Sequence, residues 1–209
     1  MAGEQFPAHL EGLPTLDDAE FLLGGLSNEE LARIPVAVND LHAQFQNDDP
    51  AGTRYLVLGS YDTPNAEREG PKDRLEAARA RLETGKPQAT AVLLEDIDPR
   101  NDNWENFYVK FRLTMATTDF NVLIAEHNDG GHELELGAAT LEETYIAKRD
   151  YRHASLDKDL EYEKYDAMMA TLFDLMDRRG HLFAWRTREE FEDAIHSIST
   201  ETHGKTTRS

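Results

Sequence analysis

The chain of 209 residues contains no cysteine. This absence excludes a disulfide framework, a thiol nucleophile and a thiolate metal site. No apolar run approaches the roughly 18 residues that would cross a bilayer, and no basic region followed by an apolar block opens the sequence. We therefore expect a cytoplasmic protein without a membrane partner.

Lysine is scarce: the 22 basic residues are mostly arginine, and they face 41 acidic residues, for a formal net charge of -19. At 1 M salt the Debye length shrinks to about 3 Å, so self-repulsion is screened while hydrated carboxylates keep the surface soluble. This composition predicts a halophilic, haloarchaeal-type protein, with an ordinary acidic protein as the alternative. Such a surface repels a phosphate backbone, so we expect no duplex nucleic acid as a partner.

Residues 1–50 are rich in proline and acidic side chains, and we interpret them as a helical N-terminal arm. Ser27 and Glu30 occupy capping-box positions of a helix that we expect to run to Pro35, with a second helix over 36–45. The arm packs against the sheet, closes over a site or joins copies of this chain into a homo-oligomer. We expect one α/β domain over 51–199 and a disordered tail over 200–209.

From residue 54 onward, apolar runs with strand character alternate with runs of helical period. The expected strands are 55–58, 89–94, 120–125, 145–148 and 181–185. The expected helices are 73–84, 104–117, 133–143, 156–179 and 188–197, the last with a cap at Thr187. Because each parallel connection needs a crossover, this alternation predicts a five-stranded parallel sheet with helices on both faces. The common order 2-1-3-4-5, which is flavodoxin-like, puts the switch point between strands one and three.

The segment DFNVLIAEHNDGGHELELGAA, residues 119–139, joins an apolar strand to a polar turn and then to a helix. Ligands bind at the carboxyl edge of a parallel sheet, where loops diverge and helices present free N–H groups. We therefore predict a pocket between the loops after strands one and three, with 150–153 as a wall. Its predicted binding residues are Gly59, Ser60, Tyr61, Asp62, Gly130, Gly131 and His132.

The ELGAA block that starts at Glu135, after a strand and a polar turn with glycines, resembles the nucleoside 2-deoxyribosyltransferase family and its flavodoxin-like relatives, which include TIR domains. Asp119 opens the third strand, as is common in that family, and HLFAWRTREEFEDAI resembles the family's last strand and helix. The chain departs from the family's D-x-G-T pattern, because His132 and Glu133 stand there. The resemblance covers residues 54–198 in layout and implies that Glu135 attacks or stabilises the anomeric carbon of a nucleoside.

A carboxylate at Glu135 suits the cleavage of a C–N glycosidic bond, because the transition state has oxocarbenium character. Asp129 or Glu133 can protonate the departing base, and Tyr61 or Ser60 can orient Glu135 or bind the sugar. The alternative is an exposed acidic residue in a helix's first turn, where the macrodipole contributes about 0.3 to 1 kcal/mol. These residues predict a nucleoside- or nucleotide-binding domain, with a non-catalytic nucleotide sensor or a protein-interaction module as the alternatives.

Three further patterns have plain structural interpretations. Gly130 and Gly131 either let a ligand approach the backbone or supply positive φ in a turn. The His and acidic residues of 127–133 suit zinc or manganese by type but match no metal motif, so we expect no metal and no cofactor. The carboxylates of 96–103 lack the glycine and terminal glutamate of a calcium loop. We also expect the aromatic residues of 104–111 to belong to the core.

Overall fold

The computed structural model describes residues 24–46, 52–61, 70–85, 88–98, 106–126, 136–151, 165, 167–203 and 205. Its five strands are β1 (Arg54–Gly59), β2 (Thr90–Leu93), β3 (Phe120–Ala125), β4 (Thr144–Arg149) and β5 (Leu182–Trp185). All neighbouring pairs are parallel, in the order β2-β1-β3-β4-β5. The predicted fold class and strand order are confirmed. β1 and β3 are direct neighbours, with Gly59 opposite Ile124.

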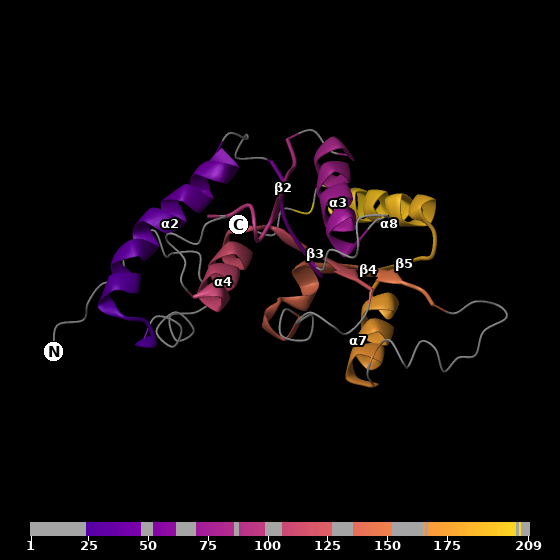
Figure 1. The fold of residues 1–209 in the computed structure, drawn as a ribbon. Helices are drawn as coiled ribbons and strands as arrows, with labels where there is room; N and C mark the ends of the chain where they lie inside the picture. The colour runs from indigo at the N-terminus through magenta and orange to yellow at the C-terminus, as the bar shows by residue number, and fades with distance from the viewer. Residues whose placement is uncertain are drawn as a thin grey trace.

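Helices cover both faces of the sheet (Figure 1). α3 (Pro71–Gly85) and α8 (Arg188–Glu201) lie on one face, whereas α2 (Asn28–Gln46), α4 (Phe107–Thr117) and α7 (Ala167–Arg178) lie on the other. Alternation along the strands divides the core accordingly, because successive side chains point to opposite faces. On β1, Tyr55 and Val57 pack with α3 and α8, and Leu56 and Leu58 pack on the other side.

The first described helix, α2, corrects the expected break at Pro35. Its predicted capping box is confirmed, since Ser27 Oγ accepts from Glu30 N at 3.2 Å and Glu30 Oε2 accepts from Ser27 N at 2.7 Å. The helix then continues through Pro35 to Gln46. A proline in a helix interior costs about 3 kcal/mol. The buried face, which consists of Ile34, Ala37, Val38, Leu41 and Phe45, offsets that cost by packing into the core.

Two aromatic residues of α4 are exposed, so the prediction that they belong to the core is wrong. Phe107 is 57% exposed and Tyr108 is 46% exposed, whereas Phe111 is buried. Asn106 caps this helix, and its Oδ1 accepts from the backbone N–H groups of Tyr108 and Val109. Both exposed rings therefore belong to the first turn of the helix. The helical spacing of apolar residues predicts which side of a helix faces the core, but it does not predict how far along the helix the core extends. Residues 99–105 lie outside the described part of the chain.

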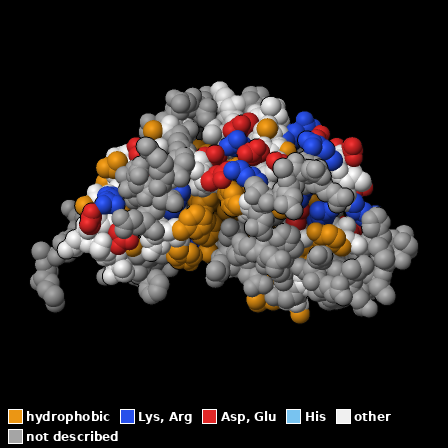
Figure 2. Space-filling view, viewed as in Figure 1, with side chains coloured by type: hydrophobic (Ala, Val, Ile, Leu, Met, Phe, Trp, Pro, Cys, Tyr) orange, Lys and Arg blue, Asp and Glu red, His pale blue; other side chains and the backbone are white. Residues whose placement is uncertain are grey.

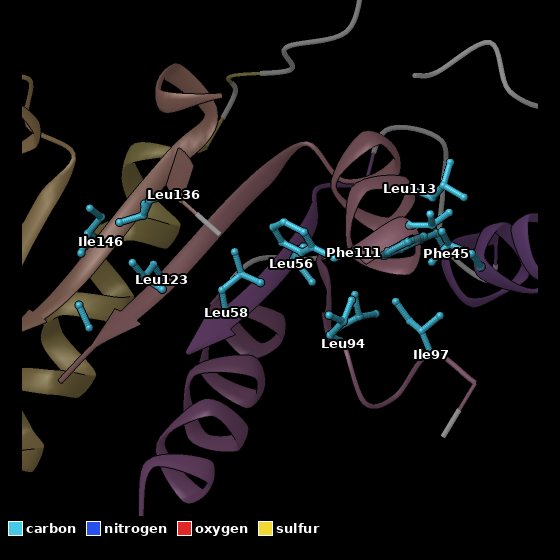
Figure 3. Packing of buried hydrophobic residues seen from close by; sticks show 14 of the residues in the cluster. Phe45, Leu56, Leu58, Leu94, Ile97, Phe111, Leu113, Leu123, Leu136 and Ile146 are labelled. Carbon is cyan, nitrogen blue, oxygen red and sulfur yellow. The ribbon is translucent and has the colours of Figure 1, made fainter. Parts of the chain in front are cut away.

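The core face that carries α2 and α4 also anchors the chain after β3 (Figure 3). Leu136, which belongs to the ELG block, is buried beside Ile146 of β4, and Leu123 of β3 lies in the same cluster. Residues 136–138 are helical, and Arg112 of α4 donates from Nη1 to Ala138 O at 3.1 Å. The carboxyl side of the segment that follows β3 is therefore fixed to the sheet and to α4.

At the amino edge of the sheet, polar side chains form hydrogen bonds and an ion pair with one another and with the main chain. Buried Asp119 accepts from the backbone N of Arg54 at 2.9 Å, and its carboxylate pairs with the Arg54 guanidinium at 3.0 Å. Tyr55 shares a hydrogen bond of 2.5 Å with Thr202 after α8, and Lys205 donates to Tyr145 at 3.1 Å. Asp119 therefore opens β3 as a structural residue, at the edge opposite to the predicted pocket. No helix in the described part of the chain has the length and apolarity needed to span a bilayer.

Candidate functional site

The structure describes three of the predicted site residues, Gly59, Ser60 and Tyr61. The others, Asp62, Asp129, Gly130, Gly131, His132, Glu133 and Glu135, lie outside the described residues. The two ends of the loop after β3 are nevertheless described, and both Glu126 and Leu136 are buried. The described site therefore consists of the carboxyl ends of β1, β3, β4 and β5 and of the side chains that meet there.

Gly59 ends β1 at a point where a Cβ atom would lie too close to its neighbours. Its φ is 152°, and a Cβ built there would lie 2.8 Å from Leu75 Cδ2 and 3.0 Å from the carbonyl oxygen of Ile124. Positive φ is accessible to glycine without a steric penalty. A glycine at this position lets β1 turn out of the sheet while α3 and β3 stay in close contact.

Tyr61 turns toward β2. Its hydroxyl accepts from the backbone N of Leu94 at 3.1 Å, and its ring packs against the core under α3. Ser60, the residue before it, is buried. The predicted contacts of Tyr61 and Ser60 with Glu135 or with a sugar remain predictions, and the described role of Tyr61 is to join the ends of β1 and β2.

Glu126, the residue after β3, is the centre of an ion-pair cluster at this edge. It is 3% exposed, and Arg74 in α3 donates to both carboxylate oxygens, from Nε to Oε1 and from Nη2 to Oε2. Arg149 at the end of β4 donates from Nη1 to Oε2 at 3.4 Å. A bidentate guanidinium is a geometrically specific partner for a carboxylate. The cluster therefore joins the first turn of α3 to the carboxyl ends of β3 and β4.

Two tyrosines bind the last carbonyl groups of the β3 region. Tyr151 donates to the backbone oxygen of Glu126, and Tyr165 donates to the backbone oxygen of Ala125 at 2.8 Å. Burial is the main cause that raises the pKa of Tyr151 above its ordinary value. The Tyr151 hydroxyl therefore stays protonated as a donor at neutral pH, and the two tyrosines hold consecutive carbonyl groups of the chain. Together with Arg74 and Arg149, they fix the main chain at the point where the predicted loop begins.

Arg149 lies between two aromatic rings. Its Cζ is 5.2 Å from the ring centroid of Trp185 and 5.3 Å from that of Tyr151, within the range of cation–π attraction. Trp185 is buried against Phe191 of α8, with ring centroids 5.0 Å apart. Its indole N–H has no hydrogen-bond partner among the described residues. A buried donor of this kind costs about 1 to 3 kcal/mol until an acceptor reaches it.

The remaining charges at this edge form separate pairs. Arg186, after β5, donates from Nε and Nη2 to Asp150 Oδ2 at 3.0 and 2.7 Å. Near β2, two pairs join α3 to the turn that follows the strand: Lys72 with Glu95 at 2.9 Å and Arg79 with Asp96 at 2.7 Å. Figure 2 shows acidic and basic side chains interspersed over α3, whereas a hydrophobic patch lies beside α4.

The segment expected as a solvated turn rather than a calcium loop is described only over 96–98. Asp96 Oδ2 accepts from Leu93 N at 2.9 Å as well as from Arg79, so this carboxylate closes the turn after β2. Within the described ranges, no group of three His, Asp or Glu side chains is arranged to hold a metal ion. The histidines and acidic residues of 127–133 lie outside those ranges.

Sequence reasoning missed Glu126 and Arg74. Alternation along β3 gave a signal for Glu126, because it follows Ala125 and therefore falls on the face that carries α3. The structure also brings Arg149 to the Glu126 carboxylate that Arg74 binds. No local pattern relates these residues, since Arg74 and Glu126 are 52 positions apart.

The fold and this edge define a doubly wound α/β protein with its switch point between β1 and β3. The model of a family of unknown function, DUF8170, matches residues 26–173, and the chain belongs to this family. No curated protein and no solved structure matches the chain.

Proposed function

We propose that the chain binds a nucleoside or nucleotide at the carboxyl edge between β1 and β3 and cleaves or transfers its N-glycosidic bond. The observation that carries this proposal is the adjacency of β1 and β3, which makes their carboxyl ends the switch point of the sheet. Ligands of open α/β sheets bind in the crevice outside such a point. The close packing around Gly59 and the fixed position of Glu126 give this edge a rigid base.

The anchoring of the ELG block supports a catalytic role for that segment. Leu136, the residue after Glu135, is buried in the core face of β3 and β4, and Arg112 holds the carbonyl of Ala138. Catalytic groups work best when they stand on elements that packing keeps in place. The block that resembles the deoxyribosyltransferase motif therefore begins on a fixed support.

Glu126 is not the reacting carboxylate in this proposal. Arg74 already binds both of its oxygens, and the residue is buried. A carboxylate held in this way is a weak nucleophile because its lone pairs are engaged. Its function is to keep the end of β3 in position, which leaves the glycosyl chemistry to the carboxylate of Glu135.

The proposed reaction uses only side chains of this protein, the substrate, and water or a second base. The Glu135 carboxylate attacks the anomeric carbon, the C–N bond breaks, and a C–O ester forms. The departing base takes a proton from Asp129 or Glu133, which then becomes a carboxylate. Water or a second base next attacks the anomeric carbon and gives its proton to the carboxylate of Asp129 or Glu133, while the C–O ester bond breaks and releases Glu135. The two outcomes are hydrolysis and transfer.

The test is free-base release in molar salt from deoxynucleosides, nucleoside monophosphates and NAD, measured by chromatography. The Glu135→Gln variant should lose release. Glu142→Gln is the matched control, because Glu142 is an exposed acidic residue that pairs with Arg179 at 3.3 Å, and it should keep release. Thermal stabilisation by a nucleotide without turnover would make the protein a sensor. No binding and no turnover would contradict the proposal and favour an interaction protein.

A further inference from the structure

Arg149 has more hydrogen-bonding capacity than the ion-pair cluster uses. Arg74 binds both oxygens of Glu126, so one positive and one negative charge are already matched there. Arg149 adds a second positive charge and makes a single long contact of 3.4 Å with the same carboxylate. That contact and a hydrogen bond with the Tyr151 hydroxyl use only part of the five N–H donors of the guanidinium. Within the described residues, no other carboxylate forms an ion pair with Arg149.

The acidic residue that is adjacent to Arg149 in sequence pairs with another arginine. Asp150, which follows Arg149 in the chain, is buried and receives both Nε and Nη2 of Arg186. The described cluster at this face of the edge thus contains three guanidinium groups, of Arg74, Arg149 and Arg186, and two carboxylates, of Glu126 and Asp150. Within the described residues, the guanidinium groups of this cluster therefore outnumber its carboxylates, whereas the whole chain has a net charge of -19.

The guanidinium of Arg149 is both accessible and held in place. Its side chain is 37% exposed, while that of Arg74 is 11% exposed. The rings of Trp185 and Tyr151 flank it at 5.2 and 5.3 Å, so its orientation is fixed by packing. A preorganised guanidinium with free donors fits the oxygens of a phosphate, which it can bind in a bidentate way.

We propose that Arg149, supported by Arg74 and the ring of Trp185, forms a phosphate subsite, so that the ligand of this edge is a nucleotide and not an unphosphorylated nucleoside. This inference rests on the proposed function, because it assigns the substrate class of the same site. Arg74 follows β1, Glu126 follows β3 and Arg149 ends β4, so the subsite adjoins the carboxyl ends of β1 and β3, where the ligand is proposed to bind. The phosphate supplies a second negative charge to a guanidinium that shares the Glu126 carboxylate with Arg74.

The experiment compares the dissociation constants of a 2′-deoxynucleoside and its 5′-monophosphate, measured by calorimetry on the full chain in molar salt. The wild type should bind the monophosphate at least tenfold more tightly. Arg149→Gln should bring the two constants within about twofold of each other. Arg149→Lys, which keeps the charge but loses the planar fork, should retain part of the preference. Arg179→Gln is the matched control, because Arg179 pairs with Glu142 at the exposed surface, and it should keep the full preference.

The outcomes separate the two proposals. Equal binding of nucleoside and monophosphate by the wild type would overturn the phosphate subsite and leave the proposed function standing. A preference that survives in a folded Arg149→Gln variant would overturn the role of Arg149. Stabilisation by inorganic phosphate alone, lost in Arg149→Gln and without any monophosphate preference, would show a site for a free anion and overturn the nucleotide assignment. Failure of both ligands to bind would overturn both proposals.

Discussion

Arg74 in α3 donates from two nitrogens to the two carboxylate oxygens of Glu126, the first residue after β3. This pair connects the helix that follows β1 to the end of β3, and it therefore spans the switch point of the sheet. Both side chains are largely buried. The pair fixes the base of the candidate site and leaves Arg149 as the accessible cation beside it.

Glu126→Gln should destabilise the fold strongly. The substitution keeps the shape of the side chain but leaves two guanidinium groups close together without their carboxylate. Removing one partner of a buried ion pair costs about 3 to 5 kcal/mol, and denaturant unfolding in molar salt would measure the loss. Glu142→Gln is the control, because its pair with Arg179 is exposed and contributes less than about 1 kcal/mol. Equal effects of the two substitutions would contradict the structural role of Glu126.

Gly59→Ala should also lower the free energy of unfolding. An alanine would adopt an unfavourable φ of 152° and push its Cβ to 2.8 Å from Leu75 Cδ2. Strain of this kind costs about 1 to 3 kcal/mol. Gly137→Ala is a suitable comparison, because a Cβ there meets no atom within 4 Å. A Gly59→Ala protein as stable as the Gly137→Ala protein would show that the turn after β1 is less constrained than described.

Asp119→Asn should separate stability from binding. The change weakens the contacts of Asp119 with the backbone and guanidinium of Arg54, and hydrogen bonds to charged groups contribute about 1.5 to 3 kcal/mol. The residue lies at the amino edge of the sheet, so ligand affinity of the folded fraction should not change. Titration of the folded variant with the nucleotide, at a temperature below its unfolding transition, measures this affinity. A large loss of affinity would indicate that the ligand binds near the amino edge instead.

Stability should fall in alkaline solution because of Tyr55. Burial is the main cause that raises its pKa from 10.0 to about 12 in the folded protein. The folded state therefore keeps the phenolic proton after the unfolded chain has lost it, so stabilisation is complete below pH 10 and is lost between pH 10 and 12. The loss amounts to about 2 to 3 kcal/mol, at about 1.4 kcal/mol per pKa unit. Urea unfolding at pH 9 and 11.5 should show a smaller decrease for Tyr55→Phe, and an equal decrease would exclude Tyr55 as the cause.

Local patterns predicted the sheet and its helix caps. The parallel sheet followed from the alternation of apolar runs and helical periods, and its order is the common one for five strands. The capping box at Ser27 and the N-cap at Thr187 also form. The continuity of α2 was not predictable in this way. Proline 35 is unfavourable by local propensity, and only the tertiary burial of residues such as Val38 and Leu41 keeps the helix whole.

The sequence predicted at which edge of the sheet the candidate site lies, but it did not predict the ion-pair cluster there. Residues at strand ends, such as Gly59 and Tyr61, could be named because the switch point of a parallel sheet is known from its order. The ion-pair cluster could not be named, because Arg74, Glu126 and Arg149 come from three elements and no spacing in a single sequence relates them. Charge pairing across the fold depends on which helix face meets which strand end.

The most direct test of ligand binding at the carboxyl edge is amide hydrogen exchange, measured by mass spectrometry with and without a saturating nucleoside monophosphate. We expect slower exchange in peptides that contain 59–61 and 149–151, because a ligand in the crevice would cover or stabilise these amides. Peptides at the amino edge, which contain Arg54, Asp119 and Thr202, should exchange at the same rate in both states. Protection confined to the amino edge, or no protection at either edge, would contradict the account.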